Sequence, residues 1–175
     1  RKQYPDTIKI VVEDQIQGSY AARNKGISEA KGNLLLFLDS NISAEIDVLR
    51  RINDYFERTD VDYLGCNVKM KLTSQSLAAK VNFVRGFNIK ISIEQHHYSP
   101  TCCLVIKKSI LEKVGYFDGR LISGGDFEFG ERVNHAEYKM KYAEEIVLWH
   151  PTRNTYKALI NKSKRIGQGN AQLAF

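Results

Sequence analysis

The stretch "NLLLFLDSNISAEI" at residues 33–46 shows the sharpest change of character in the sequence. Residues 34–38 form a continuous apolar run without the alternation of a strand exposed on one face, so we expect a strand covered on both faces. Three polar residues, Asp39, Ser40 and Asn41, follow at once. Because ligands in open α/β sheets bind at the carboxyl ends of strands, this stretch predicts a candidate binding site as well as a strand.

The composition is that of an ordinary globular protein. Of its 175 residues, 43% are hydrophobic and 26% are charged. This length is enough for one sizeable core and short for two domains. No apolar run approaches the roughly 20 residues needed to cross a bilayer. The net charge of +6 favours an anionic partner, and much of the basic excess lies in residues 157–165.

The three cysteines, Cys66, Cys102 and Cys103, show no metal-binding spacing and are an odd number. We therefore expect buried free thiols in a reducing compartment. The expected location is the cytoplasm or the inner face of the membrane.

The apolar pattern alternates between strand-like and helix-like segments. Strands are expected over 8–12, 34–38, 61–72, 102–108 and 140–150, and helices over 19–32, 45–58, 76–91, 109–115, 126–136 and 155–167. The helix over 45–58 is expected to bury Ile46, Leu49 and Ile52. Gly86 lowers the helix propensity of the segment over 76–91. The pattern predicts one α/β domain with a parallel or mixed sheet covered on both faces.

Asp39 and Asn41 can act as metal ligands. Oxygen ligands at a strand end suit Mg²⁺ or Mn²⁺, which take further ligands from phosphates. The alternative is a helix N-cap, since Asp and Asn ahead of a helix accept hydrogen bonds from its first N–H groups.

A second acidic site follows a Gly-Gly pair, where Asp126 and Glu128 begin a helix among phenylalanines. Apolar surroundings raise the pKa of a carboxyl group towards the range of a general base. The alternative is purely structural, because the helix dipole favours acids in the first turn. His150, directly after an apolar strand, is either a structural histidine or a further metal ligand beside Asp39 and Asn41.

Four segments occur in an order that resembles a known family. They are "GSYAARNKGISEAKGNLLLFLDSN" (18–41), "SPTCCLVIKKSILEKVGYFDGRLISGGDFEFGERV" (99–133), "WHPTRN" (149–154) and "KRIGQG" (164–169). Together they resemble the GT-A-fold glycosyltransferases of family 2, from about residue 8 to 169. The resemblance implies a single GT-A domain with a mixed, mostly parallel central sheet flanked by helices.

The resemblance also implies inverting transfer of a sugar from a UDP- or GDP-sugar to a hydroxyl of a glycan or lipid-linked acceptor, assisted by Mg²⁺ or Mn²⁺. Asp126 matches the catalytic base and Glu128 its close neighbour. The implied donor-binding residues are Asp39, Arg23 and Arg165, and the implied metal ligands are Asp39, Asn41 and His150.

The loop between the helix over 76–91 and the next strand is expected on the acceptor side, from its order in the chain. His97 and Tyr98 lie in this loop, and together with Gly125, which precedes the base, they are the expected acceptor-side residues. The alternative for the two adjacent histidines, His96 and His97, is that they are solvated loop residues.

The chain departs from the family pattern in two respects. Asn41 stands where the family usually has a second, metal-binding Asp, which weakens the expected cation binding. The strand at 8–12 corresponds to the third strand of the family, so we expect the chain to be a C-terminal portion of a longer enzyme without the nucleobase-binding strands. Within it, 1–72 is the expected donor and metal side, 73–154 the acceptor side with the catalytic acid, and 155–175 a basic helix.

Three other functions compete with an active transferase. A non-catalytic module that binds sugar nucleotides or glycans would explain Asn41 and the missing strands. A nucleic-acid-binding domain has only the net charge in its favour, and no recognition motif is present, so no nucleic-acid partner is expected. A nucleotidyltransferase would need a Gly-rich N-terminal signature that the sequence does not show.

Overall fold

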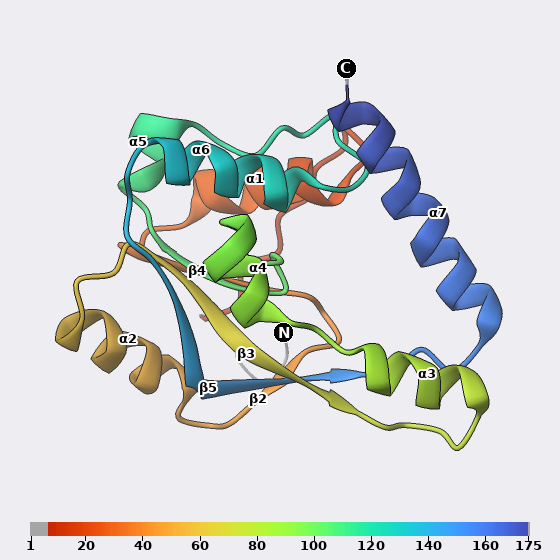
Figure 1. Cartoon of the computed structure of the whole chain (residues 1–175). Coiled ribbons are helices and arrows are strands. Elements are labelled where there is room, and N and C mark those ends of the chain that lie inside the picture. Colours follow the sequence, from red (N-terminus) through yellow and green to blue (C-terminus); the bar gives the residue numbers. More distant parts are fainter. Residues whose placement is uncertain (1–6, 175) are drawn as a thin grey trace.

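The structure is a computed structural model that describes residues 7–174. Its helices are α1 (Ser19–Glu29), α2 (Val48–Arg58), α3 (Leu77–Arg85), α4 (Ile89–His96), α5 (Ile110–Val114), α6 (Gly125–His135) and α7 (Tyr156–Leu173). Its strands are β1 (Leu34–Leu38), β2 (Ser43–Ala44), β3 (Tyr63–Lys71), β4 (Cys103–Lys107) and β5 (Met140–Pro151). Helices surround a central sheet, as the α/β pattern predicted (Figure 1).

The five strands form one sheet in the order β1-β4-β3-β5-β2. β3 pairs with β5 in parallel, whereas the pairs β1–β4, β3–β4 and β2–β5 are antiparallel. The sheet is mixed, as expected, but the expectation of a mostly parallel sheet is wrong. An interior antiparallel strand that is covered on both faces carries the same unalternating apolar run as a parallel one, and β4 is such a strand.

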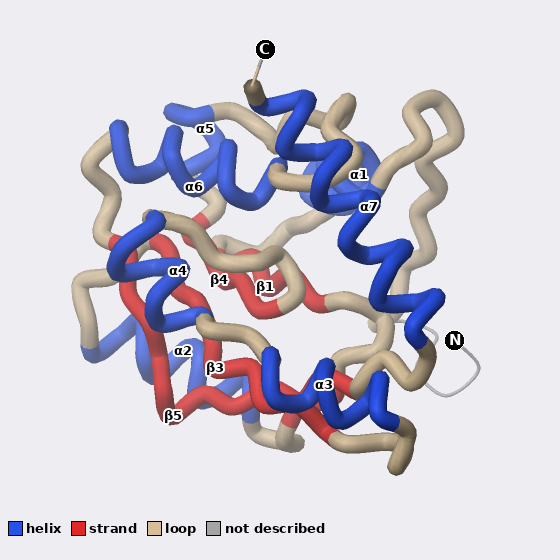
Figure 2. Tube along the Cα trace, turned by 45° about the vertical axis from the view of Figure 1, so that its right-hand side comes forward, coloured by secondary structure: helices blue, strands red, loops and turns tan. Residues whose placement is uncertain are grey.

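Helices cover both faces of the sheet. On one face, a side chain at Gly65 of β3 would collide with Ile89 and Ile93 of α4, so the absence of a side chain there lets α4 pack closely. α2 packs against β5 and buries Val48 and Ile52 (Figure 2). The buried apolar residues of the strands and helices form one core cluster, in agreement with one sizeable core.

The expected strand over 8–12 is extended chain without strand pairing, and Ile10 and Val12 are exposed. A strand needs a neighbour for its backbone groups. Within residues 7–174, β1 pairs only with β4 and therefore forms an edge of the sheet, with Leu35 as its one fully buried residue. The expectation that residues 34–38 are covered on both faces is therefore wrong.

The expected helix over 76–91 is two helices, because Gly86 has φ 48° and ends α3. Ser76 caps α3 and Asn88 caps α4 through their side-chain oxygens, which accept from Ala79 N–H at 3.2 Å and Ile91 N–H at 3.3 Å. The break places the link at residues 86–88 beside a cavity.

α2 begins at Val48, so Ile46 lies outside it and is fully exposed, and Leu49 is also exposed. The expected burial of these two side chains is wrong. Among residues 7–174, none of the helices combines the length and the apolar character that crossing a membrane requires.

Candidate active site

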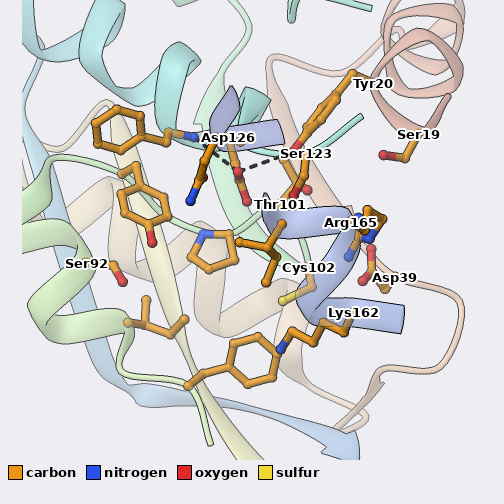
Figure 3. Close-up of a pocket in the computed structure, with 18 of the residues that line it drawn as sticks. Ser19, Tyr20, Asp39, Ser92, Thr101, Cys102, Ser123, Asp126, Lys162 and Arg165 are labelled. Atoms are coloured by element: carbon orange, nitrogen blue, oxygen red, sulfur yellow. Dashed lines mark hydrogen bonds between the residues drawn. The ribbon is translucent and has the colours of Figure 1, made fainter. Parts of the chain in front are cut away.

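A cavity of about 710 Å³ lies between α7, the start of α6, the end of β1 and the link between α3 and α4. Residues far apart in the sequence line it together (Figure 3). Six of the residues singled out in the sequence line it: Arg23, Asp39, Tyr98, Asp126, His150 and Arg165. The cavity therefore joins the strand end, the helix start and the basic C-terminal helix in one site.

Asp126 lies in the first turn of α6, directly after Gly124, whose φ of 82° turns the chain into the helix. The Tyr20 hydroxyl donates a hydrogen bond to Asp126 Oδ1 at 3.2 Å (Figure 3). Burial raises the pKa of Asp126, and the hydrogen bonds it accepts oppose that effect. Because its pKa is raised, the carboxylate binds a proton more readily than an exposed aspartate does, as a general base requires.

Tyr20 was not anticipated from the sequence. Burial and the nearby charge of Asp126 raise its pKa to about 12, so the hydroxyl remains protonated and donates to the carboxylate. Its ring lies so close to Gly125 that a methyl group there would be 2.9 Å from the ring. Gly125 therefore acts by admitting the Tyr20 ring, which no local pattern around either residue could indicate.

Glu128 does not line the cavity. It forms an ion pair with Arg132, one turn later in α6, with 2.6 Å between Oε1 and Nε. Arg132 in turn donates to the backbone carbonyls of Val114 and Tyr116. The structure thus places Glu128 in a network that ties α6 to the segment after α5.

Arg23 of α1 and Asp39 at the end of β1 form an ion pair of 2.9 Å at the cavity wall. The Arg23 side chain is 18% exposed and that of Asp39 is 43% exposed, so the carboxylate keeps access to a ligand in the cavity. Arg23 also lies 5.5 Å from the centre of the Tyr20 ring, which links this ion pair to the side of the cavity that holds Asp126.

His150 is buried, and Asn41 lies beside it, with Nδ2 of Asn41 3.4 Å from Nε2 of His150. The Nδ1–H of His150 donates to the carbonyl of Pro151 at 2.7 Å, so Nε2 carries the electron pair and accepts from Nδ2 of Asn41. Burial and the nearby cations Arg153 and Lys162 lower the pKa of His150, so the imidazole is neutral at physiological pH.

Asp39, Asn41 and His150 fit a hard divalent cation as an incomplete ligand set. Asp39 and His150 line the cavity, and Asn41, which is not part of the lining, lies beside His150. A carboxylate, an amide and a neutral imidazole therefore lie near one another. Within residues 7–174, no three His, Cys, Asp or Glu side chains gather closely enough to hold a metal ion by themselves. A bound cation would therefore need oxygen atoms from a ligand.

Arg153 and Lys162 also line the cavity and with Arg165 make a group of three cations. Figure 3 labels Lys162 and Arg165. Lys162 Nζ lies 5.3 Å from the centre of the Phe87 ring, and that ring lies 5.3 Å from the ring of His150. Burial, together with Arg153 and Arg165, lowers the pKa of Lys162. The basic content of residues 157–165 signalled such a role, but not which side chains face inward.

Tyr98 also lines the cavity, and its ring packs edge-on against Phe127 with 5.5 Å between the ring centres. His97 does not line this cavity: it ends α4 in a left-handed conformation, with φ 52°, and borders a separate cavity of about 410 Å³. Ser19, Ser92, Thr101 and Ser123 add hydroxyl groups to the lining, and Thr101 and Ser123 lie beside Asp126 (Figure 3). The lining thus combines a carboxylate, hydroxyl groups and several cations.

One cavity thus holds a carboxylate of raised pKa and clustered cations, which suit an anionic ligand. Comparison with known proteins shows the family. The model of the glycosyltransferase-like family 2 matches residues 1–169. The chain therefore belongs to this family, which confirms the resemblance seen in the sequence.

Among curated proteins, the chain is 34% identical over 169 residues to glycosyltransferase AglE of Haloferax volcanii, covering 96% of this chain and 55% of that protein. It is 28% identical to the uncharacterized glycosyltransferase MJ1057 of Methanocaldococcus jannaschii, over 84% of this chain and 52% of that protein. The chain thus spans about half the length of these relatives.

Two solved structures share the fold. The mannosyltransferase PcManGT from Pyrobaculum calidifontis, in complex with GDP-Man and Mn²⁺, superposes with a TM-score of 0.70 at 16% identity, covering 99% of this chain and 48% of that one. TarS residues 1–349 of S. aureus, in complex with UDP-GlcNAc, gives 0.63 at 19% identity, covering 88% and 45%. These neighbours confirm the GT-A fold expected from the sequence.

Proposed function

We propose that this chain belongs to the catalytic domain of an inverting glycosyltransferase that uses a nucleotide-diphosphate sugar. The observation that carries the proposal is the composition of the cavity lining: Asp126, with its raised pKa, lines the same cavity as Arg153, Lys162 and Arg165. UDP- and GDP-sugars are the proposed donors, since two neighbours of the same fold bind UDP-GlcNAc and GDP-Man.

In the proposed reaction Asp126 accepts the proton of the acceptor hydroxyl while that oxygen attacks the anomeric carbon. The bond from the anomeric carbon to the diphosphate oxygen breaks, and the diphosphate leaves with the electron pair. Attack opposite the leaving group inverts the anomeric centre. The acceptor is a hydroxyl of a glycan or of a lipid-linked sugar, and the second of these implies peripheral association with a membrane.

The cations act on the leaving group. Negative charge accumulates on the diphosphate in the transition state, and Lys162 with the two arginines stabilises it in a partly dehydrated cavity. Asp39, Asn41 and His150 would hold Mg²⁺ or Mn²⁺, which when bound supplies additional positive charge at the same oxygens. Arg23 orients Asp39 through their ion pair.

Glu128 has a positioning role in this proposal. Its ion pair with Arg132 and the bonds of Arg132 to Val114 and Tyr116 hold the first turn of α6 in place. Residues 1–72 then form the donor and metal side and residues 73–154 the acceptor side. The helix in 155–175 contributes cations to the cavity.

Asp126→Asn provides the test. We expect the variant, in the full-length protein, to bind UDP- or GDP-sugar as the unchanged protein does but to lose transfer by roughly 10²- to 10⁴-fold. Binding is measured by calorimetry and transfer by release of the nucleoside diphosphate. Asp54→Asn, at an exposed position of α2, is the matched control.

Two results would contradict the proposal. Normal transfer by Asp126→Asn would remove Asp126 as the base. Donor binding without transfer to any acceptor, in the unchanged protein, would instead favour the non-catalytic sugar-nucleotide or glycan-binding module.

A further inference from the structure

Helix α3 turns its large apolar side chains outward. The residues that it buries are Ala78, Ala79 and Asn82. Its exposed apolar residues are Leu77 at 64%, Val81 at 36%, Phe83 at 46% and Val84 at 84%. A surface helix normally buries its apolar side chains against the core, whereas α3 exposes its large apolar side chains to solvent.

The first turns of α7 extend this surface. Tyr156 is 55% exposed and Ile160 is 53% exposed. α3 packs against α7, and Ser76 Oγ donates to the carbonyl of Asn154 at 2.8 Å, so the starts of the two helices are joined (Figures 1 and 2). We call the six exposed residues Leu77, Val81, Phe83, Val84, Tyr156 and Ile160 the apolar face.

The segments that carry the apolar face have charges of one sign. Residues 63–93 and 146–175 contain ten Lys and Arg and no Asp or Glu, whereas the rest of the chain has sixteen Lys and Arg against twenty Asp and Glu. Five of these cations are exposed on the same two helices. Arg165 lines the cavity, and the other four, Lys80, Arg85, Lys157 and Lys164, do not. The net positive charge of the protein therefore arises in the segments that carry α3 and α7.

We propose that the apolar face and these four cations dock on an anionic phospholipid membrane. Helices that bind the bilayer interface combine exposed apolar side chains with Lys and Arg, and anionic lipid headgroups attract such cations. A nucleic acid would match the charge but not the aliphatic side chains, because its backbone is recognised by polar and cationic groups.

Docking in this way would bring the cavity close to the bilayer. Phe87 follows α3 directly and lies against Lys162 in the cavity wall, so the cavity borders the two docking helices. A lipid-linked acceptor would then reach Asp126 without leaving the membrane. This consequence rests on the proposed glycosyl transfer, whereas the docking itself does not.

Vesicle sedimentation tests the docking without donor or acceptor, so its result is independent of transferase activity. We expect the protein to pellet with phosphatidylcholine–phosphatidylglycerol vesicles and not with phosphatidylcholine alone. Leu77→Gln with Val84→Gln should reduce the bound fraction about tenfold or more. Lys80→Gln with Arg85→Gln should reduce it on the order of fivefold for each cation removed, and added salt should have the same effect.

Matched controls are available elsewhere on the surface. Ile46→Gln with Leu49→Gln removes two equally exposed apolar side chains from the region of α2, and Lys25→Gln with Lys31→Gln removes two exposed cations. We expect both to bind as the unchanged protein does, and circular dichroism verifies the fold of every variant. Equal losses in the controls, equal binding to neutral vesicles, or no vesicle binding together with self-association through the apolar face would each overturn the proposal.

Discussion

Asp126 shows how one residue combines opposing influences. Burial raises its pKa, while the hydrogen bond from Tyr20 favours the ionised form and lowers it. The group is a useful base only at a pH above its folded pKa, because below that pH it is protonated. If Asp126 is the base, as proposed, its raised pKa places the acid limit of activity above that expected for an exposed aspartate.

Tyr20→Phe changes this balance in a defined direction. Without the hydroxyl donor the pKa of Asp126 rises further, so the acid limb of the profile of kcat/KM against pH moves to higher pH. The profile is measured with the nucleotide sugar identified for the full-length protein. Tyr116→Phe, on an exposed tyrosine, should leave the profile unchanged; a limb that stays in place or moves to lower pH in Tyr20→Phe would contradict the role of the hydrogen bond.

At the scale of elements, the position of α7 depends on a small residue. Gly169 is buried, and a methyl group there would lie 2.4 Å from the carbonyl oxygen of Ser123, on the segment that leads to Asp126. α7 carries Lys162 and Arg165 into the cavity, so its close approach at Gly169 sets where these cations lie.

Gly169→Ala should therefore displace α7. We expect a loss of about 1–3 kcal/mol in the free energy of unfolding and weaker binding of nucleotide sugar. Chemical denaturation and calorimetry measure the two effects. Gly167→Ala is a control in the same helix, where a methyl group meets nothing within 4 Å, and its higher helix propensity should stabilise the protein by up to about 1 kcal/mol. If both substitutions acted alike, close packing at Gly169 would not position the helix.

At the scale of the whole molecule, the metal ligands proposed here come from two distant segments. Asn41 follows β1 and His150 lies near the end of β5, and folding brings them within 3.4 Å. With Asp39 they supply one formal negative charge, which is little for a divalent cation. The diphosphate of a donor would supply the remaining charge and oxygen ligands.

We expect Mn²⁺ to raise the thermal midpoint of the protein appreciably only when UDP or GDP is present, and EDTA to reverse the increase. Asn41→Asp adds a carboxylate and should allow Mn²⁺ alone to raise the midpoint, since charge at the site governs cation affinity. Thermal-shift titrations check both expectations. Ser40→Asp places the same charge one residue away and is the control; a response equal to that of Asn41→Asp would show that general charge, rather than ligation, is responsible.

Most helices and strands could be predicted because each has a local cause. β1 and β4 are apolar runs, Gly115 ends α5, and Thr155 caps α7 by accepting from Ala158 N–H. The failures arose where pairing or packing decides. The strand over 8–12 lacked a partner, and β4 carried an apolar run that does not distinguish parallel from antiparallel neighbours.

By itself, the sequence determined the family and most of the elements, and it marked Asp39 and Asp126 as candidate site residues, since these depend on motifs and local periodicity. Only the tertiary structure decided that Tyr20 hydrogen-bonds Asp126, that Glu128 turns away to Arg132, and that Arg153 and Lys162 face the cavity. The stretch over 33–46 likewise showed a polar strand end, but not that Arg23 and His150 would surround it. The physical reason is that such contacts join residues up to about a hundred positions apart, and only chain packing sets the distance between them.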